Sequence, residues 1–85
     1  MDYAVIYIPS KTGYGAYSPD VPGCVAAGST LDEARSRMSE ALQAHINSMV
    51  EDGDILPVPA HTVDEMEPAD ILEMVHVSIS EPAYR

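Results

Sequence analysis

The segment that decides the fold is GYGAYSPDVPGCVAAGSTLDEA, from Gly13 to Ala34. It begins with a strand-like run over residues 14–18, which the prolines at 19 and 22 then interrupt. Pro22 and Gly23 suit the centre of a type II turn, because proline fixes φ and glycine accepts a positive φ. A second short apolar run over residues 24–27 ends at Gly28. The segment therefore predicts two short strands joined by a tight turn.

A long helix is predicted directly after this segment. Thr30-Leu31-Asp32-Glu33 has the pattern of a capping box, with Thr30 at the N-cap and Glu33 returning to the backbone amide of Thr30. Gly53 is a suitable C-cap residue. The helix is thus expected to run from Leu31 to Asp52. Its apolar residues recur with a period of 3.6 residues: Leu31, Ala34, Met38, Ala41, Leu42, His45, Ile46 and Met49.

Two further strands are predicted near the ends of the chain. The run from Tyr3 to Ile8 is apolar at both alternating sets of positions, which is typical of a central strand covered on both sides. Residues 9–13 form a turn, so this strand pairs with residues 14–18 as a hairpin. Residues 71–80 alternate between apolar and more polar positions and predict the last strand.

Between the helix and the last strand, the sequence disfavours regular structure. Pro57 and Pro59 exclude both a helix and a central strand. Residues 62–65, Thr-Val-Asp-Glu, are a second and weaker capping box, which predicts one helical turn before Pro68.

These elements define an α+β class fold with the order β-β-β-α-β in two layers. A helical crossover after three meandering strands would return the last strand parallel to the first, in a mixed sheet of order 3-2-1-4. One long helix would cover one face. The other face would stay uncovered although residues 3–8 are apolar on both sides, which predicts a homodimer or higher homo-oligomer. We expect a single domain over residues 1–85, with residues 81–85 as a frayed tail.

The charge of the chain limits its partners. Its 85 residues contain 14 acidic and four basic side chains, and the net charge is -10. Phosphate backbones and anionic membranes both attract Lys and Arg, so neither direct nucleic-acid binding nor membrane binding is expected. The negative electrostatic field of such a chain would favour a basic protein partner. A role of the acidic residues in solubility alone would explain the same composition.

The single cysteine and the N-terminus indicate the compartment. One cysteine cannot form an internal disulfide and fits a reducing environment. MDYAVIYIPS lacks the positive region of a signal peptide, and no apolar stretch has transmembrane length. A cytoplasmic protein is expected.

No catalytic or metal site emerges from the sequence. Cys24 follows the tight turn, but its surroundings are acidic and would not stabilise a thiolate, so a structural role is favoured. His45, His61 and His76 have no metal-ligand spacing. We expect neither a metal nor a cofactor.

Eight of the 14 acids fall between Glu51 and Glu73 without a single Lys or Arg. Individually they suit solvated positions, but as a cluster they would attract a basic surface. The predicted partner-binding residues are Asp64, Glu65, Glu67, Asp70 and Glu73. The tyrosines could line an interface or a ligand cleft, and ordinary strand packing explains them equally well.

Taken together, these motifs resemble the HicB-like antitoxin domain. The resemblance rests on the D-x-P-G-C turn of residues 20–24, the downstream G-x-T-x-x-E-A of residues 28–34, the A-L-x-x-H-I run of residues 41–46, and E-D-G at 51–53. The residues that carry the structural motif are Pro22, Gly23, Cys24, Gly28, Thr30 and Glu33.

The resemblance implies a trimmed ribonuclease H-like fold without catalysis. It also implies dimerisation and neutralisation of a small basic toxin ribonuclease, HicA-like, by masking of its active site. Many family members carry a C-terminal DNA-binding segment, whereas this sequence ends five residues after its last predicted strand, so unaided operator binding is not expected. Two alternatives are an orphan homo-oligomeric adaptor or small-ligand-binding domain on the same fold, and a relic metal-dependent nuclease.

Overall fold

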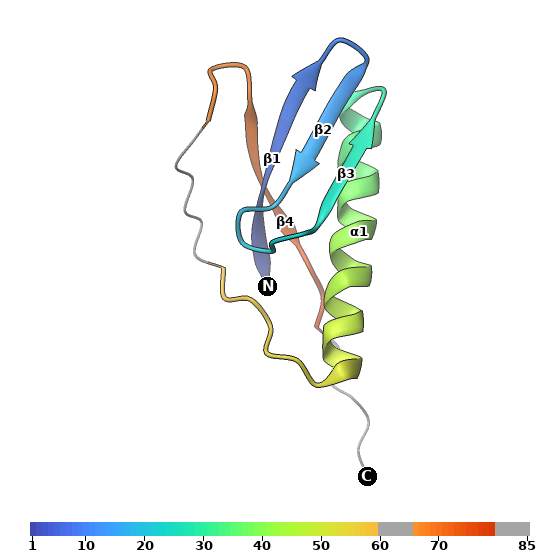
Figure 1. Cartoon of the computed structure of the whole chain (residues 1–85), viewed down its shortest axis with the longest axis vertical. Coiled ribbons are helices and arrows are strands. Elements are labelled where there is room, and N and C mark those ends of the chain that lie inside the picture. The colour runs from blue at the N-terminus through green and yellow to red at the C-terminus, as the bar shows by residue number, and fades with distance from the viewer. Residues whose placement is uncertain (60–65, 80–85) are drawn as a thin grey trace.

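The computed structural model describes residues 1–59 and 66–79, and it shows a four-stranded sheet with a long helix beside it (Figure 1). The elements are β1 (Asp2–Ser10), β2 (Gly13–Tyr17), β3 (Val25–Gly28), α1 (Leu31–Asp52) and β4 (Ile71–His76). All four predicted strands are present. β4 ends at His76, earlier than predicted, and the helical turn expected at residues 62–65 lies outside the described residues.

The bounds of α1 agree with the sequence prediction. Thr30 is the N-cap, and its Oγ1 accepts a hydrogen bond from the Glu33 N–H at 3.1 Å. Gly53 takes the left-handed conformation at φ 73° and ends the helix. One detail of the capping box was predicted wrongly. The Glu33 carboxylate accepts from the N–H and the hydroxyl of Ser29, at 2.8 and 2.9 Å, one residue before the cap.

The sheet has the predicted order, β3-β2-β1-β4, but it is not mixed. β4 runs antiparallel to β1, with Asp2 opposite His76 and Tyr7 opposite Ile71. The helix alone does not make the crossover. α1 is joined to β4 by the connection of residues 53–70, whose last described residues, 66–70, lie at the β1–β2 hairpin end of the sheet, so that β4 enters from that end (Figure 1). Entry from this end makes β4 antiparallel to β1.

The hydrophobic core lies between α1 and one face of the sheet. Ala34, Met38, Leu42 and Ile46 of the helix meet Tyr3, Val5 and Tyr7 of β1, all almost fully buried. α1 packs mainly on β3 and β2. Beside it, the connection adds Leu56 to the same core, and Tyr3 donates a 2.8 Å hydrogen bond from its hydroxyl to the Pro57 carbonyl.

Strand register places a second apolar set on the opposite face, which we call the open sheet face. No helix covers it within residues 1–59 and 66–79. Its apolar members are Ala4, Ile6 and Ile8 of β1, Tyr17 of β2, Val25 and Ala27 of β3, and Leu72 and Met74 of β4. Ala4 and Ile6 are fully buried, whereas Val25, Leu72 and Met74 are 66%, 46% and 48% exposed.

Gly28 allows β3 to approach α1 closely. A Cβ atom at this position would lie 2.5 Å from the Ala34 backbone nitrogen and 2.9 Å from the Glu33 carbonyl carbon. Backbone atoms cannot move aside as a flexible side chain can, so only glycine fits here. Gly28, which the sequence predicted to end the strand, is thus also required for the close packing of the sheet on the helix.

Candidate partner-binding site

The segment after β2 folds into two consecutive turns. The Val21 N–H donates to the Ser18 carbonyl at 3.3 Å, and the Cys24 N–H donates to the Val21 carbonyl at 3.2 Å. Gly23 has φ 86°, the positive value that the third residue of a type II turn requires. The predicted Pro22-Gly23 turn is therefore confirmed.

These turns bring two polar side chains to the backbone of Ala4. The Asp20 carboxylate accepts from the Ala4 N–H at 2.9 Å, and the Ser18 hydroxyl donates to the Ala4 carbonyl at 2.7 Å. All three residues are buried. β2 ends at Tyr17, opposite Ile6, so Ala4 lies beyond its reach. Asp20 and Ser18 thus replace the missing strand partner, a role that sequence reasoning did not anticipate.

Asp20 and Cys24 are therefore both structural parts of this segment. Cys24 is almost fully buried in the core, and burial raises the pKa of its thiol. A thiol with a raised pKa is a poor nucleophile near neutral pH. Burial also raises the pKa of Tyr3, to which the negative charge of Asp20 adds.

The acidic stretch expected to bind a partner is partly described. The residues from Glu67 to Asp70 form a tight turn in which the Asp70 N–H donates to the Glu67 carbonyl, and the Glu67 N–H donates to the Asp70 carboxylate, both at 3.0 Å. Pro68 takes the second position, which proline favours. Glu67 is exposed, and the segment of residues 66–70 lies at the end of the molecule that also carries the β1–β2 hairpin (Figure 1). Asp64 and Glu65 lie outside the described residues.

Glu73 differs from the other predicted partner-binding acids. It lies on the helix side of β4, where its carboxylate accepts three hydrogen bonds from the Arg35 guanidinium, the shortest at 2.6 Å. Arg35 also contacts Asp32 at 2.9 Å. These bonds, first those from Glu73, raise the pKa of Arg35 above its usual value. The charge of Glu73 is thus neutralised within the domain.

The acidic cluster of the sequence is divided in space. Glu51 and Asp52 are the last two residues of α1 and Asp54 follows its C-cap, whereas the segment of residues 66–70, with Glu67 and Asp70, lies at the opposite end of the molecule (Figure 1). The last turn of α1 contains no basic residue. Because the helix dipole is negative at this end, the acids there are electrostatically unfavourable.

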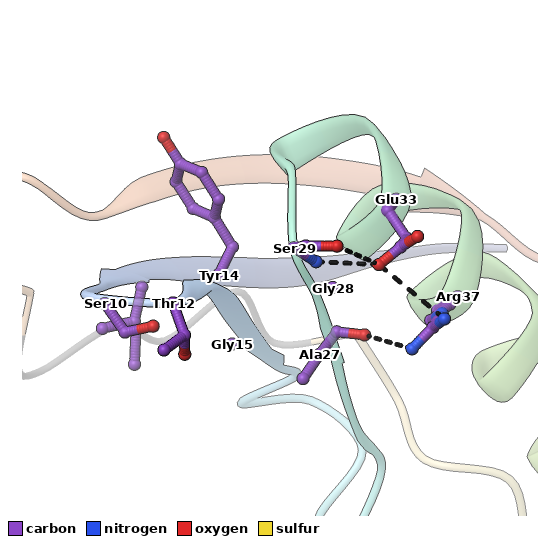
Figure 2. Close-up of a pocket in the computed structure, with 10 residues that line it drawn as sticks. Ser10, Thr12, Tyr14, Gly15, Ala27, Gly28, Ser29, Glu33 and Arg37 are labelled. Atoms are coloured by element: carbon purple, nitrogen blue, oxygen red, sulfur yellow. Dashed lines mark hydrogen bonds and ion pairs between the residues drawn. The ribbon is translucent and has the colours of Figure 1, made fainter.

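A cleft with a volume of about 630 Å³ opens beside the β1–β2 hairpin. Its floor includes Gly15 and Ala27, and its rim includes Thr12, Glu33 and Arg37 (Figure 2). Arg37 donates to the Ala27 carbonyl at 3.3 Å and lies 3.7 Å from the Glu33 carboxylate. Glu33 also accepts hydrogen bonds from Ser29, so Glu33 and Arg37 of the rim are both paired within the domain (Figure 2).

The histidines do not converge. His45 is half-buried on α1, the exposed His76 contacts Asp2 at 2.7 Å through Nδ1, and His61 lies outside the described residues. Across the described ranges, no three His, Cys, Asp or Glu side chains are grouped as a metal site. In the same residues, no helix is long and apolar enough to cross a membrane.

Comparison with known proteins agrees with this geometry. Residues 3–81 match the family described as the HicB-like antitoxin of bacterial toxin–antitoxin systems. The chain therefore belongs to the HicB-like antitoxin family. Its fold is also that of solved members. The N-terminal domain of the Burkholderia pseudomallei antitoxin HicB superposes with a TM-score of 0.74 at 26% identity, over 93% of this chain and 100% of that one.

Two further structures are informative. A chain of the HicA3 and HicB3 toxin–antitoxin complex matches 93% of this chain and 100% of its own length, with a TM-score of 0.67 and 25% identity. A longer Burkholderia pseudomallei HicB structure matches the whole of this chain and 72% of its own, with a TM-score of 0.78 and 25% identity.

Curated relatives come from a phage and an archaeon. An uncharacterized 14.9 kDa protein of Haemophilus phage HP1 is 44% identical over 57 residues, 67% of this chain and 43% of the relative. The UPF0150 protein Ta0767 of Thermoplasma acidophilum is 34% identical over 58 residues, 67% of this chain and 84% of the relative. The matched part thus spans less than half of the phage relative.

Proposed function

We propose that this domain is a non-catalytic antitoxin module that neutralises a small basic toxin ribonuclease, HicA-like, by masking its active site in the cytoplasm. The observation that carries the proposal is the match of 93% of the chain to a chain of a toxin–antitoxin complex. Masking needs shape and charge complementarity, and it requires no catalytic group on the antitoxin.

The charge of the chain supports a basic partner. Of its four basic residues, Arg35 is bound to Glu73 and Asp32, and Arg37 lies beside Glu33. The net charge of -10 therefore lies at the surface, where few basic side chains stand beside the acidic ones. A field of this kind steers a basic protein toward the domain and acts mainly on the association rate.

For the toxin-facing surface we propose the acidic segment that leads into β4. It includes Glu67 and Asp70, together with Asp64 and Glu65. Glu67 projects from a turn fixed by two backbone-directed hydrogen bonds, so its position is well defined. Glu73, bound to Arg35, would contribute by holding β4 against α1.

The test is co-expression with the product of the adjacent open reading frame, scored for complex formation and rescue from toxicity. In the purified complex, Glu67→Lys combined with Asp70→Lys should lower the association rate at least about tenfold and reduce its salt dependence. Unchanged binding would exclude this surface, and absence of any complex or rescue would refute the antitoxin role.

The opposite end of the molecule provides a charge-matched control. Glu51→Lys combined with Asp54→Lys changes the net charge by the same amount but acts at the C-terminal end of α1. We expect this variant to bind with nearly normal kinetics. A larger effect at this end than at Glu67 and Asp70 would place the toxin beside the helix terminus.

A further inference from the structure

β4 is an edge of the sheet, since the order β3-β2-β1-β4 gives it β1 as its one neighbour among the described strands. Just beyond the paired residues, the Val77 N–H donates to the Met1 carbonyl at 2.7 Å and the Met1 amine donates to the Val77 carbonyl at 3.0 Å. Hydrogen-bonded and non-hydrogen-bonded pairs alternate along antiparallel strands. The pairs made by His76, Met74 and Leu72 are therefore non-hydrogen-bonded, and the backbone N–H and C=O groups of these three residues point away from β1.

The hydrogen bonds of Ala4 confirm this orientation from the other side of β1. Asp20 and Ser18 bind the N–H and the carbonyl of Ala4, in the place where a β2 residue would otherwise pair. Ala4 lies opposite Met74, so the two residues do not use their backbone groups on each other. Across the described ranges, no hydrogen bond reaches the outward groups of the three β4 residues.

The same edge is closed one step further along the chain. The Gln43 amide of α1 donates to the Ser78 carbonyl at 2.8 Å and accepts from the Ser78 N–H at 3.1 Å, so a side chain takes the place of a strand there. At the opposite edge of the sheet, Arg37 donates to the Ala27 carbonyl of β3. Within the described residues, β4 itself has no such cover. It also contains no Pro, Lys or bulge, the features that commonly protect an edge from an added strand.

We propose that the outer edge of β4 receives an extended strand of the basic toxin, which becomes a fifth strand of the sheet. The backbone groups of Leu72, Met74 and His76 would hold it. This inference rests on the proposed function and adds the way in which the partner is bound. In strand addition, main-chain hydrogen bonds provide affinity, and the alternate side chains of the added strand provide specificity.

Charge favours a basic strand over a second copy at this edge. The turn that carries the exposed Glu67 leads directly into β4, and the sequence has no Lys or Arg between Glu51 and Glu73. Arg35 reaches β4, but it is already bound to Glu73. Two chains that each carry a net charge of -10 repel one another, whereas a strand with Lys or Arg beside Glu67 is attracted.

The register of β4 also predicts the pattern of the added strand. The side chains of Leu72 and Met74 lie on the open sheet face and are 46% and 48% exposed. Every second side chain of an adjacent strand lies beside them on that face. We therefore expect a toxin segment of about six residues with apolar side chains at alternate positions, and with Lys or Arg at the end that lies near Glu67.

Amide hydrogen exchange followed by NMR tests this edge directly. The isotope-labelled domain is measured alone and in complex with the product of the adjacent open reading frame. In the free domain, the N–H groups of Leu72, Met74 and His76 should exchange quickly, whereas those of Glu73 and Val75, which point toward β1, should exchange slowly. In the complex, exchange at the three outward groups should slow on the order of 100-fold.

Two substitutions at one position separate the backbone from the side chain. Met74→Pro removes one outward N–H without breaking a hydrogen bond to β1, and edge strands tolerate proline at such positions. It should weaken the complex at least about tenfold, because an acceptor of the toxin strand loses its donor. Met74→Thr changes the same side chain but keeps the N–H, and it should bind within about threefold of the unchanged domain. Thermal unfolding of both variants checks that they fold.

Slowed exchange at the three outward N–H groups, with a larger loss of binding for Met74→Pro than for Met74→Thr, supports the added strand. Fast exchange of these groups within a formed complex overturns it and leaves the antitoxin role standing, even where the proline variant does not fold. Equal losses in the two variants also overturn it, because the side chain would then be the binding group. Protection in the free domain that grows with its concentration assigns the edge to a second copy. Absence of any complex refutes the proposed function and the added strand together.

Discussion

Arg35 and Glu73 join the first turns of the helix to the middle of β4 through a two-pronged ion pair, with the guanidinium Nε and Nη2 at 3.0 and 2.6 Å from the carboxylate oxygens. The two residues are far apart in sequence, and both side chains are partly exposed. This pair fixes the last strand of the sheet against α1.

We therefore predict a small, coupled effect of Arg35→Met and Glu73→Gln. Ion pairs that solvent reaches contribute little, so each variant should lower the melting temperature by no more than about 5 °C. The double variant should lose less than the sum, which thermal unfolding of all four proteins would show. Strict additivity would mean that the two side chains do not interact in solution.

Asp20→Ala should destabilise the fold more than either of those changes. It removes the acceptor for the buried Ala4 N–H, and an unsatisfied buried donor costs about 1–3 kcal/mol. Urea unfolding of Asp20→Ala and Asp20→Asn provides the measurement. The asparagine retains a carbonyl oxygen at the same place and should recover much of the loss. Equal losses in both variants would show that the negative charge matters more than the hydrogen bond.

Gly28→Ala should be strongly destabilising, by about 1–3 kcal/mol or more, because its methyl group would overlap the backbone of α1. Gly15→Ala is the matched control, since its methyl group would enter open space. That control should be neutral or slightly stabilising. Chemical denaturation at protein concentrations below 1 μM would compare the monomers. A tolerated Gly28→Ala would contradict the close approach of β3 to the helix.

Glu33 should make stability depend on pH in the acidic range. Hydrogen bonds from Ser29, with the nearby Arg37 charge, lower the pKa of this carboxyl below its ordinary value of 4.5. A pKa lowered by folding gives stability that is complete above pH 4.5 and lost as pH falls through the lower folded value. Glu33→Gln should therefore flatten the fall in melting temperature below pH 4.5. Glu40→Gln, on the exposed surface of α1, should leave that profile unchanged.

Cys24 should react slowly with thiol reagents. Its pKa is raised above the ordinary 9.0 by burial, so less than about 1% is thiolate at pH 7. Labelling should be at least tenfold slower than for a free cysteine peptide and should accelerate in urea in parallel with unfolding. Fast labelling of the folded protein would restore the nucleophile hypothesis.

The elements that the sequence predicted well are those whose determinants are local. α1 was located correctly because Thr30 and Gly53 mark its ends and its apolar period is continuous between them. The direction of β4 was predicted wrongly because it depends on the path of residues 53–70, and no short pattern encodes that path. A crossover rule that treats the helix as the whole connection fails when a further segment lies between the helix and the last strand.

The candidate site was harder to predict for a related reason. From the sequence, Asp20 is typical of a turn residue. Its hydrogen-bond partner is the backbone N–H of Ala4, 16 residues away, and a contact with a backbone group cannot be predicted from the pattern of side chains. The acidic cluster was correctly noticed, yet closeness in sequence did not give closeness in space. Glu73 binds Arg35, and the C-terminal end of α1, with Glu51, lies at the other end of the molecule from the segment of residues 66–70 (Figure 1).

The pairing of β4 with β1 also has a consequence for biosynthesis. Asp2 lies opposite His76, so the contacts that complete the sheet have almost the largest sequence separation this chain allows. Such high contact order slows folding, because a long loop must close before its contacts form. A nascent chain cannot complete the sheet until residue 76 has left the ribosome. Nascent chains truncated before β4 should therefore stay susceptible to proteases, and binding activity should appear only after synthesis of this strand.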